Sequence, residues 1–434
     1  MNNLIQPRIL KGFRDFLPNS EIQRTTLTEK ITKVYRSFGF VPIDTPVLEY
    51  TEILLRKSNG ETEKQVFRFE DNGGRDVAMR FDLTVPFARF TAEHKDEIYF
   101  PFKRYHVAKV WRGEKPQAGR YREFVQCDVD IVGSDSAASD FEILNVMKCA
   151  FKEIGVENIT IHVNHRGIFN RFLNTLGVLD KSEDILRSVD KLAKVGKDEV
   201  FKELCEYTQD EEKSSKIIEY ISSTGSFLEI LDKIESLAGG KDSDSERMRE
   251  IYMMMQASGI EQFYVLDPSI TRGLDYYTGV VYETFLNDLP SIGSVCSGGR
   301  YDNLAGLYMK EKVPGVGVSI GLDRLIAGLE QLGQTQQKGS YLDVEIYCLD
   351  AKNAIHYQKV ASELRANDIC VEVFPDAKKM AQQYAVTTAK CVPWGILISE
   401  EEIKNNTFTL KNLQTREMFA DMTVEKAVKI IKNI

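Results

Sequence analysis

Apolar and polar side chains alternate along residues 122–131, and this alternation constrains the fold more than any other feature of the chain. The apolar side chains stand at odd positions: Val125, Cys127, Val129 and Ile131. The even positions carry Arg122, Phe124, Gln126, Asp128 and Asp130. A period of two places these sets on opposite faces of a β-strand. One face therefore packs into a core, and the other is either an ordinary water-facing surface or a binding site.

This strand is the second half of a predicted β-hairpin that spans residues 104–133. Turn residues at 116–119 separate two strand-like segments. Between positions 101 and 126 there are seven Lys or Arg residues and two Glu residues, so the local charge is +5 in a chain whose net charge is −9. The sequence therefore predicts a hairpin with a basic loop.

The polar groups on this strand are unusual for a plain surface. An arginine guanidinium matches phosphate oxygens, and a carboxylate binds a cationic amine or an imidazole N–H. The ring of Phe124 can stack on a nucleotide base. These are the components of a nucleotide site next to an amino-acid site, and they favour the binding-site interpretation.

The composition excludes several classes of protein. At 434 residues the chain is long enough for roughly two or three domains. It has no apolar run of membrane-spanning length and no apolar signal-peptide core at its start, so we expect a cytoplasmic protein that binds no membrane. Seven scattered cysteines without a CxxC pair, and only five histidines, predict neither disulfides nor a metal site. The negative net charge argues against DNA binding by bulk charge but leaves open a structured RNA that a local basic surface reads.

Patterns in the first 260 residues predict a β-rich domain with a helical insertion. A capped helix ends near Ser37, and residues 40–48 are β-like but contain two prolines, which confines them to a sheet edge, an interface or an irregular strand. A hairpin is predicted at 66–81. Asp82 and Thr84 then begin a helix, either as caps or as site residues. Residues 166–259 are helical in character, with charged faces.

The remaining patterns place a domain boundary near residue 335. Strands are predicted at 263–266 and 280–285, and glycines at 297–302 mark a turn or bulge or allow a ligand to approach the backbone. Residues 315–325 pass from a strand into a helix whose first turn holds Arg324, where a bound anion would offset the unfavourable helix dipole. We predict a first domain at 1–330, a linker at 331–340, and a small α/β domain with a mostly parallel sheet at 341–434.

Together these segments resemble the class II aminoacyl-tRNA synthetases and, among them, the histidyl-tRNA synthetases. Residues 40–48 resemble motif 1 of the class, residues 104–133 motif 2, and residues 315–325 motif 3. The histidine-specific runs are Arg-Gly-Leu-Asp-Tyr-Tyr at 272–277 and Ser-Gly-Gly-Arg-Tyr-Asp at 297–302. The resemblance implies an α+β catalytic domain built on an antiparallel sheet with the helical insertion, followed by a small α/β anticodon-binding domain.

The resemblance implies a histidine–tRNA ligase that uses ATP with Mg²⁺. Such an enzyme converts L-histidine to histidyl-adenylate, transfers it to the 3′ end of tRNA(His), and forms a homodimer through motif 1. One alternative is a catalytically silent paralogue that senses histidine as the regulatory subunit of ATP phosphoribosyltransferase. Those paralogues typically lack the anticodon domain and parts of the signatures, both of which this chain has.

The resemblance also implies roles for residues at matching positions. The catalytic set is Arg112, Gln126 and Arg272. ATP would be bound by Arg112, Glu114, Arg120, Phe124 and Arg324. Histidine would be bound by Asp82, Thr84, Gln126, Asp130, Arg272, Tyr276, Tyr277 and Tyr301. Lys115 is the candidate contact for the extra 5′ guanosine of the tRNA.

Overall fold

The computed structural model describes residues 4–55, 61–117, 119–270, 276–335 and 338–433, and the chain forms two compact units. The first comprises Met1–Arg14 and Leu27–Gln334, and the second comprises Asp15–Thr26 and Thr335–Ile434. The boundary between Gln334 and Thr335 falls within the segment predicted as a linker. Each unit has its own hydrophobic core. Within these described ranges, no helix is long and apolar enough to cross a membrane.

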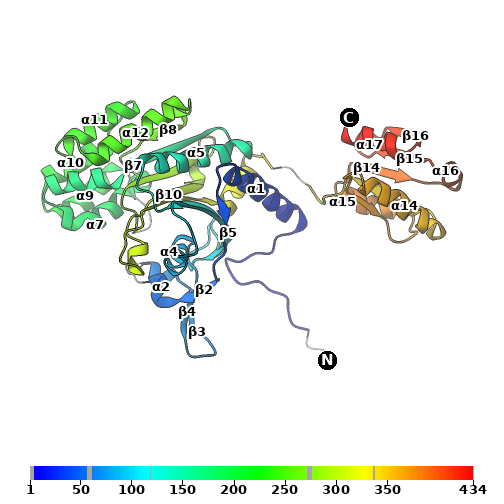
Figure 1. The fold of residues 1–434 in the computed structure, drawn as a ribbon, viewed down its shortest axis with the longest axis horizontal. Coiled ribbons are helices and arrows are strands. Elements are labelled where there is room, and N and C mark those ends of the chain that lie inside the picture. The colour runs from blue at the N-terminus through cyan, green and yellow to red at the C-terminus, as the bar shows by residue number, and fades with distance from the viewer. Residues whose placement is uncertain (1–3, 56–60, 118, 271–275, 336–337, 434) are drawn as a thin grey trace. The chain divides into compact units, whose positions relative to one another are not determined.

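An eight-stranded sheet dominates the first unit (Figure 1). From edge to edge its strands are β1 (Val41–Pro42), β5 (Phe102–Trp111), β6 (Glu123–Val132), β11 (Gly315–Gly321), β10 (Cys296–Arg300), β9 (Val280–Leu286), β7 (Ile159–His165) and β8 (Tyr264–Leu266). The six central strands pair antiparallel, as predicted. The edge strands β1 and β8 instead pair parallel with β5 and β7, because long connections rather than hairpins join each of these pairs. The sheet is therefore mixed at its edges.

The predicted hairpin is confirmed, since β5 and β6 pair antiparallel along their full lengths. The odd-numbered apolar residues of β6 belong to the main core, together with residues of α1 (Pro18–Ser37) and α5 (Ala137–Glu153). Each such fully buried side chain contributes roughly 1.5–3 kcal/mol to folding. Tyr35 of α1 donates a hydrogen bond to the carbonyl oxygen of Cys127, which holds the helix on this face. The even-numbered face of β6 therefore points away from the main core.

The chain between β7 and β8 forms the predicted helical insertion, drawn in green in Figure 1. Its helices are α6 (Arg166–Thr175), α7 (Ser182–Val189), α8 (Leu192–Val195), α9 (Lys197–Thr208), α10 (Glu211–Ile221), α11 (Phe227–Leu237) and α12 (Ser243–Ala257). Side-chain caps explain four of their starts: His165 caps α6, Asp210 caps α10, Ser226 with Glu229 forms a capping box on α11, and Asp242 with Ser245 forms one on α12. Buried residues of these helices join the main core, so the insertion packs as part of the first unit.

A three-stranded sheet with short helices lies in the first unit beside the large sheet. Its order is β2 (Leu48–Tyr50), β4 (Asp76–Met79) and β3 (Arg68–Glu70). The helices here are α2 (Thr51–Leu55), α3 (Glu61–Gln65) and α4 (Thr84–Glu93), and α13 (Leu322–Gln331) follows β11. Strands β3 and β4 are the hairpin predicted at 66–81. The proline-containing run supplies β1 at an edge of the large sheet, which is one of the predicted positions.

The second unit contains a five-stranded sheet in the order β13 (Val371–Val373), β12 (Val344–Ile346), β14 (Trp394–Leu397), β15 (Phe408–Asn412) and β16 (Met418–Met422). Its helices are α14 (Ala354–Arg365), α15 (Met380–Ala389), α16 (Glu400–Asn405) and α17 (Val424–Lys432). The prediction of a mostly parallel sheet is wrong, because β14, β15 and β16 pair antiparallel. Connections after β14 are shorter than the crossover of about a dozen residues that parallel pairing needs. The sequence interpretation also missed α16, although Ser399 and Glu402 form a capping box there.

Candidate active site

The even-numbered face of β6 is not an ordinary water-facing surface. Gln126, Asp128 and Asp130 are each less than a tenth exposed. The strand lies inside the sheet, and its register places Arg104 of β5 and Gly317 of β11 on either side of Asp130. A buried polar group without a partner costs roughly 1–3 kcal/mol, so a run of them on one strand needs a reason. The water-facing interpretation is therefore wrong for these three residues.

Glycines on the neighbouring strands make room for this buried polar layer. A Cβ atom on Gly317 would lie 1.8 Å from Oδ1 of Asp130, and one on Gly299 of β10 would lie 2.8 Å from Cδ1 of Tyr277. These glycines thus allow side chains from other segments to lie against the sheet. The sequence interpretation expected the glycines of 297–302 to mark a turn or to admit a ligand, whereas Gly299 admits a tyrosine ring.

Tyrosine hydroxyls hold the carboxylates of the layer. Tyr276 donates a hydrogen bond to Oδ2 of Asp82 at 3.2 Å, and Tyr301 donates one to Oδ1 of Asp130 at 2.6 Å. The ring of Tyr276 packs edge-to-face against the rings of Tyr277 and Tyr301, with centroids 4.9 and 5.9 Å apart. Oδ1 of Asp82 accepts a hydrogen bond from a backbone N–H in the first turn of α4. Asp82 therefore accepts a backbone hydrogen bond at the start of α4 and also belongs to this cluster.

Gln126 and Thr84 lie in the same cluster. The Nε2 atom of Gln126 donates a hydrogen bond to Oγ of Ser319 at 2.6 Å. The Oε1 atom of Gln126 is buried and has no hydrogen-bond partner. Thr84 is buried and forms a hydrogen bond with the Tyr276 side chain. Because buried acceptors in proteins are normally paired, the unpaired oxygen of Gln126 favours a ligand as its partner.

A buried guanidinium lies among these acids. Arg104 is completely buried, its Nη2 lies 2.7 Å from Oδ2 of Asp130, and its guanidinium carbon lies 4.3 Å from the centre of the Phe87 ring. Burial raises the pKa of Asp130, and the charge of Arg104 opposes that shift. Burial also raises the pKa of Asp82. The sequence interpretation gave Arg104 no role, and only the register of the hairpin identifies it as the partner of Asp130.

At the loop end of the hairpin, Arg112 lies between two aromatic rings. Its guanidinium carbon is 4.4 Å from the centre of the Phe81 ring and 5.1 Å from that of Phe124. Its Nε donates a hydrogen bond to the carbonyl oxygen of Phe81 at 3.1 Å. Stacking of this kind holds the plane of a guanidinium, and with it the directions of its remaining N–H groups.

Arg120, Glu114 and Arg324 gather near Arg112. Nη1 of Arg120 lies 3.7 Å from Oε2 of Glu114. Arg324, in the first turn of α13, donates a hydrogen bond to the carbonyl oxygen of Ser294 at 2.6 Å. Burial, followed by the positive charges of Arg120 and Arg112, lowers the pKa of Arg324 to about 10. Because these guanidiniums repel one another, this corner of the sheet suits a polyanion.

The N-terminal segment ties the hairpin loop to the helix that carries Arg324. Asp323 accepts a hydrogen bond from the backbone N–H of Val125 at 2.8 Å and another from Nη2 of Arg14 at 2.7 Å. Nη1 of Arg14 also donates to the hydroxyl oxygen of Tyr121 at 3.0 Å. The sequence interpretation missed both Arg14 and Asp323, because an acid in the first turn of a helix is already expected from the helix dipole.

The described residues predicted for the site form two groups along β6. The first group consists of Arg112, Glu114, Arg120, Phe124 and Arg324. The second consists of Asp82, Thr84, Gln126, Asp130, Tyr276, Tyr277 and Tyr301. Strand β6 contributes to both groups. Arg272 lies outside the described residues.

Comparisons with known proteins assign the chain to a family. Residues 12–325 match the family model described as Histidyl-tRNA synthetase. A Treponema denticola protein named Histidine–tRNA ligase is 62% identical over 407 residues, which are 92% of this chain and 91% of that protein. The chain belongs to the histidyl-tRNA synthetase family. The resemblance inferred from the sequence motifs is therefore confirmed.

Further matches extend this result to the second unit and to the fold. Residues 343–434 match a family model described as Anticodon binding domain. The Histidine–tRNA ligase of Treponema pallidum is 53% identical over 425 residues, which are 96% of each chain. A crystal structure of histidyl-tRNA synthetase from Nostoc is 29% identical, has a TM-score of 0.90, and covers 99% of this chain and 100% of that one. The predicted fold class is confirmed as well.

The regulatory-subunit alternative gains no support. A Bacillus halodurans structure described as ATP phosphoribosyltransferase regulatory subunit/histidyl-tRNA synthetase has a TM-score of 0.75, but its 20% identity indicates a shared fold alone. Relatives at 41–62% identity over nearly the whole chain carry the name Histidine–tRNA ligase. The chain is an aminoacyl-tRNA synthetase, an enzyme of the ligase class.

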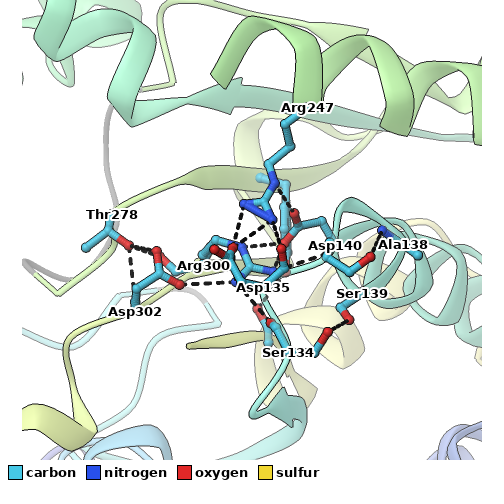
Figure 2. A network of polar contacts seen from close by, with 12 residues as sticks. Ser134, Asp135, Ala138, Ser139, Asp140, Arg247, Thr278, Arg300 and Asp302 are labelled. Carbon is cyan, nitrogen blue, oxygen red and sulfur yellow. Dashed lines mark hydrogen bonds and ion pairs between the residues drawn. The ribbon is translucent and has the colours of Figure 1, made fainter. Parts of the chain in front are cut away.

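Arg300, Asp140 and Arg247 form an ion network in this synthetase (Figure 2). Arg300, at the end of β10, is 1% exposed, and its Nε donates a hydrogen bond to Oδ1 of Asp140 at 2.8 Å. Nε of Arg247, from α12 of the helical insertion, lies 3.3 Å from Oδ2 of the same carboxylate. Burial raises the pKa of Asp140, and both arginines oppose the shift. The network therefore joins the large sheet, α5 and the insertion.

The same network fixes the segments that carry the tyrosines. Nη1 of Arg300 lies 3.1 Å from Oδ1 of Asp302, whose Oδ2 accepts a hydrogen bond from the Thr278 hydroxyl at 2.8 Å. The backbone N–H of Thr278 donates to the carbonyl oxygen of Arg300. Tyr277 precedes Thr278, and Tyr301 follows Arg300. The network therefore holds the backbone next to both tyrosines in place.

Removal of the Arg300 side chain should strongly destabilise the first unit. The Arg300→Met substitution leaves Asp140 buried without its nearest cation, and breaking a buried ion pair in this way costs about 3–5 kcal/mol. Denaturant unfolding of the first unit measures this loss. Lys33→Ala is the control, because it removes an exposed pair with Glu153 that is worth about 0–1 kcal/mol. Equal losses in both variants would contradict a structural role for the network.

Proposed function

We propose that ATP and histidine bind side by side along the even-numbered face of β6 and react there. Family membership makes the chain a histidine–tRNA ligase, so its substrates are histidine, ATP and tRNA. One observation supports this placement above the others: guanidiniums gather at the loop end of β6, and buried carboxylates lie farther along the same strand. A triphosphate suits the first group, and the cationic ammonium group and the N–H donors of an amino acid suit the second.

At the loop end of β6, each residue would bind a different part of ATP. Arg112 would bind the α-phosphate, Arg120 the β- and γ-phosphates, and Arg324 the γ-phosphate. Phe124 would stack on adenine, and Glu114 would bind its edge. The mutual repulsion of the three guanidiniums supports this assignment, since a bound triphosphate would relieve it.

At the other end, Asp130 and Tyr277 would bind the imidazole of histidine. Asp130 suits this role because Tyr301 and Arg104 hold its carboxylate in one orientation. The α-amino group would be surrounded by Asp82, Thr84 and Gln126, and the pocket walls would be Tyr276 and Tyr301. These carboxylate and amide oxygens are acceptors that match the N–H donors of an amino acid.

The reaction proceeds in two displacements. A carboxylate oxygen of histidine attacks the α-phosphorus of ATP, and pyrophosphate leaves. The terminal ribose hydroxyl of tRNA then attacks the carbonyl carbon of the adenylate, and AMP leaves. Neither step needs a nucleophile from the protein, so the rate depends on positioning and charge stabilisation. Arg112 would stabilise the α-phosphate, Gln126 would orient histidine, and by family resemblance Arg272 would contact both.

Mg²⁺ accompanies ATP in this class of enzyme and, when bound, supplies positive charge to the departing pyrophosphate. This ion prefers carboxylate and phosphate oxygens. Burial lowers the pKa of Arg324, and the carboxylate charge of Glu283 opposes that shift, so Glu283 lies near the proposed γ-phosphate site. It fits the ion chemically and would hold it there.

Contacts beyond the pocket follow from the same assignment. The domain predicted at 341–434 would bind the anticodon, because residues 343–434 match an anticodon binding domain. Lys115 is exposed in the hairpin loop and would contact the 5′ guanosine of the tRNA. Strand β1 would lie in a homodimer interface, where the exposed Val41 and Val47 would be covered. We place the enzyme in the cytoplasm, with a catalytic domain at 1–330 joined to the second domain by the linker.

Exchange of pyrophosphate into ATP tests the first step directly. We expect exchange that depends on histidine and is not stimulated by threonine, glycine or proline. Histidine binding without exchange would favour the regulatory alternative, and exchange with another amino acid would overturn the assignment of the pocket. Sedimentation of the purified chain tests the dimer, which a monomer at working concentration would contradict.

A further inference from the structure

Asp128 is a buried acid of the proposed pocket, and the proposed function gives it no role. It lies between Gln126 and Asp130 on the even-numbered face of β6, and the register places it between His106 of β5 and Ser319 of β11. It is 2% exposed, and its Oδ1 atom has no hydrogen-bond partner. A buried carboxylate oxygen in this position requires either a ligand or a proton.

The charge of Asp128 acts on the pocket tyrosines. It raises the pKa of Tyr276 and of Tyr277, although burial is the larger cause for both phenols. The carboxyl therefore lies close to the two rings that line the proposed histidine site.

A second unpaired acceptor lies next to it on the same strand face. The Oε1 atom of Gln126 is buried and has no hydrogen-bond partner. Its Nε2 donates to Ser319, which also forms a hydrogen bond with Asp128, so Ser319 holds both side chains. Two unpaired acceptors two positions apart match one ligand group with several N–H donors. A primary ammonium group has three.

The charges around Asp128 also favour a cationic ammonium group as its partner. Arg104 lies against Asp130, so that pair is close to neutral, whereas Asp82 and Asp128 remain acidic neighbours. Burial raises the pKa of Asp128 to about 7, and Asp130 and Asp82 add to the shift against the opposition of Arg104 and Ser319. His106 brings no positive charge at neutral pH, since burial and then Arg104 lower its pKa to about 4.

We propose that Asp128 accepts a hydrogen bond from the α-ammonium group of histidine, together with Gln126 and Asp82. This inference rests on the proposed function, which places histidine on this strand. The carboxyl holds a proton below about pH 7, and histidine binding releases that proton to solvent while the ammonium group keeps its own three. Because the binding form is the carboxylate, histidine affinity should rise as the pH increases through about 7.

Several titratable or charged groups interact electrostatically with Asp128 or pair with it in the sheet. They are Arg80 after β4, Arg104 and His106 on β5, Asp130 on β6, Asp82 before α4, Tyr276 and Tyr277 before β9, and, on the core side of the sheet, Tyr35 on α1 and Cys296 on β10. The phenols and the thiol have raised pKa values and stay neutral at pH 7, as does His106. We therefore expect substitution of Asp128 to change the number of protons released when histidine binds.

The Asp128→Asn variant tests the inference with two ligands. Histidine carries the α-ammonium group, whereas 3-(imidazol-4-yl)propionate has the imidazole and the carboxylate but lacks that group. We expect the KM for histidine in pyrophosphate exchange to rise by about 10- to 100-fold, the usual effect of losing a hydrogen bond to a charged group. The inhibition constant of 3-(imidazol-4-yl)propionate and the KM for ATP should stay within about twofold. Equal losses for both ligands, or an unchanged KM for histidine, would overturn the proposal.

Proton release supplies an independent measurement. Calorimetric titration with histidine near pH 6.5, in buffers of different ionisation enthalpy, gives the number of protons released on binding. Wild type should release more protons than Asp128→Asn, and Asp128→Glu should retain the release because it keeps a carboxylate. Equal release by wild type and Asp128→Asn would overturn the proposal. Failure of wild type to show histidine-dependent exchange would instead overturn the proposed function.

Discussion

The Arg112→Ala substitution should reduce histidine-dependent pyrophosphate exchange by about 10²–10³-fold, the effect of removing one preorganised group that stabilises transition-state charge. The guanidinium is held between Phe81 and Phe124 and by a hydrogen bond to the Phe81 carbonyl, so it needs no reorganisation when the phosphate reacts. Arg112→Lys should recover little activity, because an ammonium group cannot bind two phosphate oxygens in one plane. Exchange rates of the purified variants measure both effects.

Lys109→Ala is the matched control for this experiment. Lys109 is an exposed cation on the same hairpin, and its Nζ lies 2.8 Å from Oε1 of Glu123, away from the proposed phosphate corner. Its removal should leave exchange within about twofold of wild type, as for most surface substitutions. If Arg112→Ala retained normal exchange, the phosphate assignment would be wrong. Similar losses in both variants would indicate a general effect of hairpin charge.

The Gly317→Ala substitution should raise the KM for histidine by about 100-fold or more, although it adds a single methyl group. The new Cβ atom would lie 1.8 Å from Oδ1 of Asp130, so this carboxylate must move. Its contacts with Tyr301 and Arg104 leave it no free direction. A displacement of about 1 Å in a positioning group can cost about 10²-fold, and here we expect the loss in the KM for histidine because Asp130 is assigned to substrate binding. The KM for ATP should change much less, since the phosphate corner lies at the other end of β6.

The Gly306→Ala variant is the control, because it replaces a glycine without a clash near the site. A Cβ atom at Gly306 would have no neighbour within 4 Å, so this variant should keep a normal KM for histidine. Retained ATP binding by the Gly317→Ala protein shows that its fold survives. A normal KM for histidine in that variant would mean that Asp130 moves freely, and would remove Asp130 from the imidazole site.

The period of two along residues 122–131 was enough to predict the hairpin and the face of β6 that enters the core. The cross-strand partners of the even-numbered residues of β6 could not be predicted, because the pairing register of a hairpin depends on its turn. A hairpin centred on 116–119 would pair Arg104 with Ile131, whereas the structure pairs it with Asp130. A slip of one residue exchanges the two faces of a strand. Because the loop between β5 and β6 is irregular, the ion pair between Arg104 and Asp130 could not be predicted from the sequence.

Other parts of the site depend on contacts between distant segments. Tyr276 and Tyr301 were predicted from family motifs, but their hydrogen bonds to Asp82 and Asp130 are a result of tertiary packing. The contact between Arg14 and Asp323 joins the two ends of the first unit, and no local sequence pattern predicts it. The parallel edge strands escaped prediction for a similar reason, since long connections lead to both of them.

Strand β11 is the last strand of the large sheet to be synthesised, yet it lies between β6 and β10 near the middle. Before it is added, β1, β5 and β6 share no hydrogen-bonded neighbour with β10, β9, β7 and β8. Contacts over such long sequence separations form slowly, and a domain on the ribosome folds only after its chain has emerged. The growing polypeptide therefore gains the proposed pocket only once the chain through Arg324 is available, so we expect an incomplete translation product to activate no amino acid.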